Sequence, residues 1–275
     1  MWRKVAHGLG VQGDTGSASA YAWPVEAVRI PAVAGSFYPA DPAGLRETVS
    51  GLLAQAAPGA APKAMIVPHA GYIYSGPVAA SVFRRIEGAR FTRVVLLGPS
   101  HFVHLRGVAL PGARAMRTPL GDVAVEEAGL PHNPRAHSLE HSLEVELPFL
   151  QVALGGFTLV PLAVGEAAPE EVAAVLGQLW GGPETLVVIS SDLSHYLPYG
   201  EAQKMDAASA GEILALGRLR PEAACGAAPV NGLLLEARRR VLRAERVDLR
   251  NSGDTAGDKV RVVGYGAFAF YERSA

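Results

Sequence analysis

Residues 64–76, AMIVPHAGYIYSG, combine a short apolar strand with a turn that carries a histidine. Ala64 to Val67 has the character of a buried strand, His69 follows in the turn, and Pro77 predicts the start of a helix. A histidine at the carboxyl end of an apolar strand lies where open α/β sheets bind their ligands. The stretch therefore predicts an α/β fold with a site at this edge of its sheet.

The same pattern of apolar strand and histidine occurs twice more. Residues 93–101, RVVLLGPSH, end at His101, and residues 185–195, TLVVISSDLSH, end at His195. Parallel strands present their carboxyl ends at one edge of a sheet. We therefore predict that the three strands are neighbours and that the imidazoles of His69, His101 and His195 converge in one cleft.

The composition is typical of a folded globular protein. Of 275 residues, 49% are apolar and 19% charged, and the formal net charge is -1. The absence of a Lys/Arg-rich run argues against nucleic acid or a membrane surface as a partner. No apolar stretch is long enough to span a bilayer, and the N-terminus lacks the apolar core of a signal peptide, so we expect a cytoplasmic protein.

The order of the expected elements indicates one domain. Residues 1–28 are rich in Gly, Ser and Ala and are expected to form a flexible N-terminal extension. Asp41 and Pro42 are typical of a helix start, and Pro148 should kink or split a leucine-faced helix over residues 139–154. Residues 29–275 are predicted to form a single three-layer α/β domain with a mostly parallel central sheet.

His69 and His101 are the first candidates for a metal site. Each follows a strand through a short turn that contains proline, VPHAG and GPSHF. Either histidine alone is more simply interpreted as a hydrogen-bonded turn residue. Equivalent positions on successive strands favour metal ligation, although imidazole suits iron, copper and zinc alike.

Two further candidates have ordinary alternatives. Asp192 and His195 are three residues apart, which in a helical turn places them on one side. This spacing fits a histidine acid or base oriented by a carboxylate, or equally a helix cap by Asp192. Cys225 is the only cysteine and precedes a helix expected near Pro229. It is either an inert core residue or a thiolate favoured by the helix N-terminus.

A third group of candidates lies at a helix start. His141 and Glu144 are three residues apart and do not form the HExxH motif of zinc proteases. Both are assigned a supporting role behind the metal ligands, with a solvated helix end as the alternative. A serine hydrolase is disfavoured because the G-x-S-x-G elbow is absent.

Seven segments together resemble the Memo family, also described as AmmeMemoRadiSam system protein B. They run in order over about residues 30–271: PAVAGSFYP, VPHAGYIYSG, LGPSHF, EHSLEVELPFL, SSDLSHY, ACGAAPVNGLLL and SGDTAGDKVRVVGYGAFAF. The fold of this family is similar to that of class III extradiol dioxygenases, non-haem iron enzymes that open catechol rings. The resemblance thus implies an extradiol-dioxygenase-like fold.

The resemblance also implies a set of site residues. His69, His101 and Cys225 correspond to the metal ligands, and His195 corresponds to the acid-base histidine of the dioxygenases, with Asp192 beside it. The dioxygenases have a glutamate where this chain has Cys225. The resemblance to non-haem iron enzymes implies Fe(II) as the metal, and because a soft thiolate shifts the preference toward copper or zinc, Cu and Zn are the alternatives. Should Cys225 not bind metal, Asp192 is the next candidate for the third ligand.

Two classes of function follow from the resemblance. The first is a metal-dependent redox enzyme, dioxygenase-like, acting on an unknown small molecule or peptide. The alternative is a non-catalytic protein that uses the same pocket for metal handling or for binding a peptide or partner. Genes of the family often accompany those of AMMECR1-domain and radical SAM proteins, which implies a link to their pathway.

Overall fold

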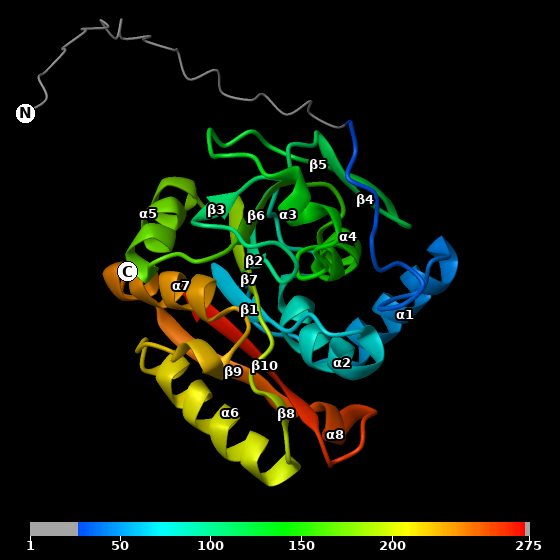
Figure 1. Ribbon diagram of the computed structural model, residues 1–275. Coiled ribbons are helices and arrows are strands. Elements are labelled where there is room, and N and C mark those ends of the chain that lie inside the picture. Colours follow the sequence, from blue (N-terminus) through cyan, green and yellow to red (C-terminus); the bar gives the residue numbers. More distant parts are fainter. Residues whose placement is uncertain (1–26, 273–275) are drawn as a thin grey trace, which may run out of the picture.

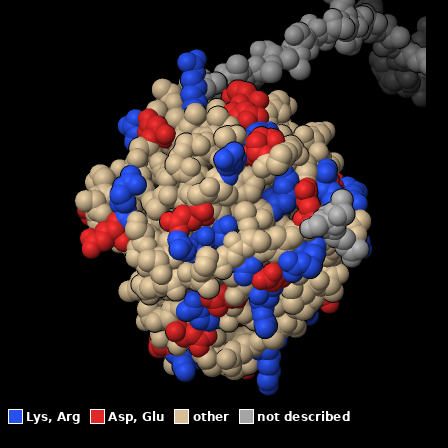
Figure 2. All heavy atoms as spheres, turned by 180° about the vertical axis from the view of Figure 1, so that it is seen from behind, with Lys and Arg blue, Asp and Glu red and all other residues tan. Residues whose placement is uncertain are grey.

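The computed structural model describes residues 27–272 of the chain (Figure 1). The predicted flexible extension, residues 1–28, lies outside the described residues except for its last two, so its character stays a prediction. Acidic and basic side chains are interspersed over the face shown in Figure 2. Within residues 27–272, no helix is both long and apolar enough to cross a membrane.

An eight-stranded mixed sheet forms the centre of the molecule. Its order is β3-β6-β2-β7-β1-β10-β8, and β9 pairs with β10. The four strands β6, β2, β7 and β1 are parallel. The strands are β1 Ala64–Val67, β2 Arg93–Pro99, β3 Val108–Ala109, β6 Thr158–Val164, β7 Thr185–Ser190, β8 His195–Leu197, β9 Arg243–Asn251 and β10 Val262–Tyr271.

The three strands that precede the histidines are neighbours, as predicted. β7 lies between β2 and β1, and its Ile189 is level with Leu97 on one side and Ile66 on the other. The carboxyl ends of the three strands are therefore side by side. β1 and β7 are buried along their whole length, which explains their continuous apolar runs.

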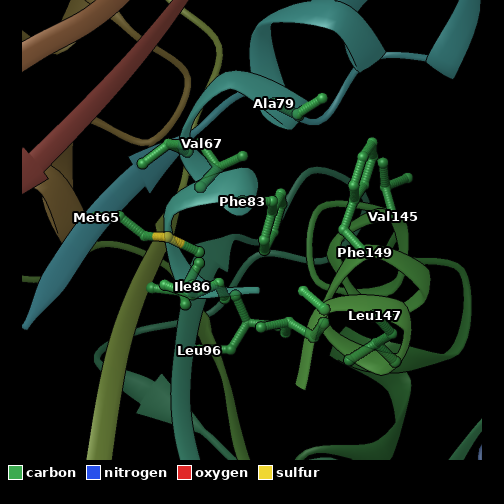
Figure 3. Packing of buried hydrophobic residues seen from close by; sticks show 14 of the residues in the cluster. Met65, Val67, Ala79, Phe83, Ile86, Leu96, Val145, Leu147 and Phe149 are labelled. Carbon is green, nitrogen blue, oxygen red and sulfur yellow. The ribbon is translucent and has the colours of Figure 1, made fainter. Parts of the chain in front are cut away.

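Helices cover both faces of the sheet and complete the predicted three layers. One face packs against α1 Pro42–Gln55, α2 Tyr72–Phe83 and α4 Leu147–Leu154. Phe83 and Phe149 stack there with ring centroids 4.9 Å apart (Figure 3). The other face packs against α5 Pro169–Leu179, α6 Tyr199–Leu214 and α7 Ala227–Arg239. Short elements complete the chain: β4 Ala115–Thr118, β5 Gly121–Ala124, α3 Pro134–Ser138, α8 Ser252–Thr255 and three 3₁₀ turns at Arg84–Ile86, Glu144–Glu146 and Pro221–Ala223.

Of the prolines used to predict helix boundaries, Pro42 marks a helix start as predicted and Pro77 does not. Asp41 caps α1 as predicted, since its carboxylate accepts from the N–H of Gly44 at 2.6 Å. Pro77 does not open α2, which begins at Tyr72 and contains Pro77. The proline removes the N–H that would bind the carbonyl of Ile73, and this loss is tolerated because Ile73 is exposed.

The leucine-faced stretch is split rather than kinked. α4 begins at Leu147 with Pro148 in its first turn, where a missing N–H costs nothing. The preceding residues 144–146 form a 3₁₀ turn, and Leu139 is 63% exposed. The helical spacing of the leucines therefore overstated the length of the helix.

Candidate metal centre

Three side chains from different elements meet at the carboxyl edge of the sheet. His69 follows β1, His101 follows β2, and Cys225 directly precedes Gly226, the N-cap of α7. Each offers one ligand atom, and these atoms all lie within 4.8 Å of one another. Nε2 of His69 is 3.3 Å from Sγ of Cys225. These are the three residues that the resemblance assigned as metal ligands.

Both histidine rings are held through Nδ1. Nδ1 of His69 lies 2.7 Å from Oγ of Ser190, the last residue of β7. Nδ1 of His101 lies 2.9 Å from Oε1 of Glu140. A partner on one ring nitrogen selects the tautomer and leaves the other nitrogen for a metal. Nε2 is thus the nitrogen that each ring offers to an ion.

Glu140 is an ionised carboxylate in a nearly closed environment. It accepts the main-chain N–H of His101 at 2.6 Å and that of Ser142 at 2.8 Å. Burial raises the pKa of Glu140, but these donors and the His101 ring outweigh it and hold the pKa at about 2. The carboxylate therefore fixes both the backbone and the ring of His101.

The predicted convergence of the three imidazoles is confirmed. His69, His101 and His195 line one cavity of about 700 Å³, together with His141 and Asp192. The ring of His141 stacks on that of His101, with centroids 4.8 Å apart and planes 17° apart. Burial lowers the pKa of His141 below its usual value, so this ring is neutral near pH 7.

The expected pairing of Asp192 with His195 is wrong. Residues 191–194 are irregular rather than helical, so the three-residue spacing does not place the two side chains together. Oδ1 of Asp192 instead accepts the main-chain N–H of His69 at 2.8 Å, and Nδ1 of His195 lies 2.8 Å from the carbonyl oxygen of Leu193. Burial raises the pKa of Asp192 to about 7 despite the N–H donors of His69 and Ala70. Asp192 therefore positions the turn that carries His69.

Comparisons with known proteins agree with the motifs and the geometry. A family model described as Memo-like protein matches residues 29–269. A MEMO1 family protein of Aquifex aeolicus is 40% identical over 269 residues, covering 86% of this chain and 97% of the relative. A MEMO1 family protein of Sulfolobus acidocaldarius is 34% identical, and the match covers 86% of this chain and 97% of the relative. A MEMO1 family protein of Archaeoglobus fulgidus is also 34% identical, and the match covers 88% of this chain and 99% of the relative.

The chain belongs to the Memo family.

In this Memo-family chain, Glu144 does not have the supporting position that the sequence analysis assigned to it. Its carboxylate pairs with the buried Arg29 and accepts the hydroxyl of Tyr38 at 2.5 Å and the main-chain N–H of Ala32 at 2.7 Å. Glu144 thus anchors the segment before α1 to the domain. The carboxylate that contacts the His101 ring is that of Glu140. Sequence spacing alone could not show which of Glu140 and Glu144 takes this position.

Ser190 and Glu146 were not recognised from the sequence as parts of the centre. Oγ of Ser190 lies 2.8 Å from Oε1 of Glu146 and 2.6 Å from the carbonyl oxygen of Ser142, in addition to His69. Burial raises the pKa of Glu146 well above its usual value, so it is neutral. The only signal in the sequence was that Ser190 ends a strand beside two others that end near histidines.

Of the two alternatives left open for Cys225, burial opposes the thiolate that a helix N-terminus would favour. Burial raises the pKa of its thiol to about 12, and the nearby Asp192 adds to this effect. Hydrogen bonds from Ser191 and from the backbone of Gly226 act in the opposite direction and lower the pKa, but their effect is smaller. Desolvation therefore outweighs the helix dipole, and the thiol is protonated until a cation reaches it.

We predict that Glu144→Gln destabilises the fold without weakening metal binding. Removing the charge leaves Arg29, which is 5% exposed, as an unpaired buried cation, and breaking a buried pair in this way costs about 3–5 kcal/mol. Urea unfolding measures the loss. Glu127→Gln is the control, since its exposed pair with His132 should contribute under about 0.5 kcal/mol. Unchanged stability with weaker metal binding would return Glu144 to the centre.

We also predict slow alkylation of Cys225 by iodoacetamide in metal-free protein. With a pKa of about 12, the rate should rise about tenfold per pH unit between about pH 7 and 9 without levelling off. Because the chain has one cysteine, labelling reports on Cys225 alone. The unfolded protein in denaturant is the control and should react faster. A plateau below about pH 8 would show that the helix N-terminus prevails after all.

Proposed function

We propose that the chain is a metal-dependent redox enzyme whose ion is held by Nε2 of His69, Nε2 of His101 and Sγ of Cys225. The observation that carries this proposal is the approach of three ligand atoms to within 4.8 Å at the carboxyl edge of the sheet. The adjoining cavity of about 700 Å³ has room for an organic substrate.

The residues present fit a transition-metal ion. Two neutral imidazoles and one thiolate form a borderline-to-soft donor set, which suits Fe(II), our first choice, and also Cu or Zn. Ser190 and Glu140 hold the rings in the required tautomer. When bound, such an ion supplies a Lewis acid and, if it is iron or copper, an electron-transfer centre. Three protein ligands would leave part of the coordination sphere free for a substrate or water.

His195 is the proposed acid or base. Because Nδ1 faces the carbonyl oxygen of Leu193, it carries the proton, and Nε2 keeps a lone pair. Burial lowers the pKa of His195, so the ring is neutral near pH 7 and able to accept a proton at Nε2. The backbone of the next residue, Tyr196, has a positive φ of 58°, a conformation that a non-glycine residue adopts only where surrounding contacts impose it.

A non-catalytic metal-handling or partner-binding protein is the alternative. Large apolar side chains are exposed on or beside the cavity lining, with Ile73 at 69% and Tyr196 at 62% exposed, and they suit contact with a peptide or protein. Oxygen uptake by the Fe(II)-loaded protein with a panel of catechols discriminates the two classes. Either version of the proposal includes a pathway link to AMMECR1-domain and radical SAM proteins. Either version also includes a cytoplasmic location, because a free thiol stays reduced there.

Metal analysis of protein purified without oxygen tests the proposed centre. Wild type should contain metal, and Cys225→Ser should bind it at least about 100-fold more weakly, because loss of a mere supporting residue already costs about 10–100-fold. The serine variant should also lose the preference for thiophilic metals. If it binds iron and copper like wild type, Cys225 is a core residue and Asp192 becomes the third-ligand candidate.

His195→Ala should separate binding from turnover. Metal content should stay near that of wild type because the ring is outside the three-residue cluster, while any oxygen-dependent turnover should fall about 100-fold or more. His132→Ala, which removes a histidine away from the cavity, is the matched control. Complete loss of metal from His195→Ala would show that His195 is itself a ligand.

A further inference from the structure

The three proposed ligands face two different cavities. His69 and His101 line the larger cavity, whereas Cys225 lines a separate cavity of about 250 Å³. The smaller cavity lies between the loop after β2, the loop after β6 and the start of α7. No lining residue is shared by the two cavities within the described part of the chain. The ligand cluster therefore forms a wall between them.

The smaller cavity carries two further metal-ligating side chains. His104 and Glu166 are on its lining, and Nδ1 of His104 is 3.9 Å from Oε1 of Glu166. Both side chains are 69% exposed, so they are at the solvent end, whereas Cys225 is only partly exposed. Arg106 lies 4.0 Å from the other oxygen of Glu166 but is 86% exposed, so solvent and salt screen its charge.

The backbone holds His104 and Glu166 on facing segments. The N–H of Glu166 donates to the carbonyl of Leu105 at 2.8 Å, and that of Gly107 donates to the carbonyl of Glu166 at 2.9 Å. A Cβ at Gly165 would collide with the carbonyl oxygen of Leu105, so only glycine allows this close approach. The two loops are joined like paired strands, and the mouth of the cavity is preformed.

We propose that the metal ion enters and leaves the centre through this smaller cavity, with His104 and Glu166 as transient ligands at its mouth and Cys225 as the first permanent ligand. The inference rests on the proposed function, since it requires that His69, His101 and Cys225 bind the ion. An imidazole and a carboxylate are weak ligands as a pair, which suits an ion that must be passed on. Entry from this side leaves the larger cavity free for a substrate during metal exchange.

Loading kinetics with Co²⁺ test the route, because the absorption of a Co²⁺–thiolate bond reports the arrival of the ion at Cys225. In stopped-flow mixing, the double variant His104→Ala/Glu166→Gln should load about tenfold more slowly than wild type, a loss typical of a removed steering site. Release to excess chelator should slow by the same factor. The affinity should then change by less than about twofold, because a residue on the path alters both rates equally.

Two more variants complete the design. Ala228→Leu narrows the smaller cavity from the start of α7 and should also slow both loading and release. His132→Ala/Glu127→Gln is the matched control, since it removes an exposed His–Glu pair of 2.9 Å that belongs to neither cavity, and its rates should equal those of wild type.

The possible results separate the route from the centre. Wild-type rates in both the double variant and Ala228→Leu, with normal Co²⁺ binding, would overturn the entry route and leave the centre intact. A weaker equilibrium affinity in the double variant with unchanged loading would also overturn it, because the two residues would then be ligands of the bound ion. Failure of wild type to bind Co²⁺ through Cys225 would refute the proposed function itself.

Discussion

The candidate centre depends on the junction between the ends of β1 and β7. The N–H of Ser191 donates to the carbonyl of Val67 at 2.8 Å, and Asp192 accepts the N–H of His69. The ring of His69 then contacts Ser190, which is directly across from Val67 in the parallel pair. Backbone and ring of His69 are thus both held by the neighbouring strand. A histidine that is 1% exposed and fixed twice has one available nitrogen and one direction in which to offer it.

Two carboxylates four residues apart show how differently buried charge can be used. Glu140 receives N–H donors from the loop of His101, and its ionisation serves the orientation of that ring. Glu144 pairs with Arg29 and accepts the N–H groups of Ala32 and Val33, and these contacts secure the chain segment before α1. Each is stabilised by several donors, as a buried carboxylate must be. Only the first belongs to the centre, so burial and charge alone do not identify a functional residue.

The sequence was sufficient to predict the sheet and the meeting of the histidines, because both follow from local patterns. Continuous apolar runs predict buried parallel strands, and the ends of neighbouring parallel strands must coincide. The position of Asp192 was not predictable in this way, since its spacing from His195 has meaning only in a helix and the segment is irregular. The start of α2 at Tyr72 was missed because Pro77 is typical of a first turn, and the local sequence does not show that Ile73, four positions earlier, is exposed. Cys225 entered the site through the resemblance, and its partner His69 is 156 positions away in the chain.

Burial leaves most ionisable groups of the centre neutral. It lowers the pKa of His69 and raises the pKa of Asp192, Cys225 and Glu146, so that each of these groups tends to be neutral. Glu140 is the exception, because its donors outweigh its burial. A cation that binds at Cys225 would convert its thiol to a thiolate and release a proton. The same desolvation that keeps these groups neutral would thus couple any metal binding at Cys225 to the release of a proton.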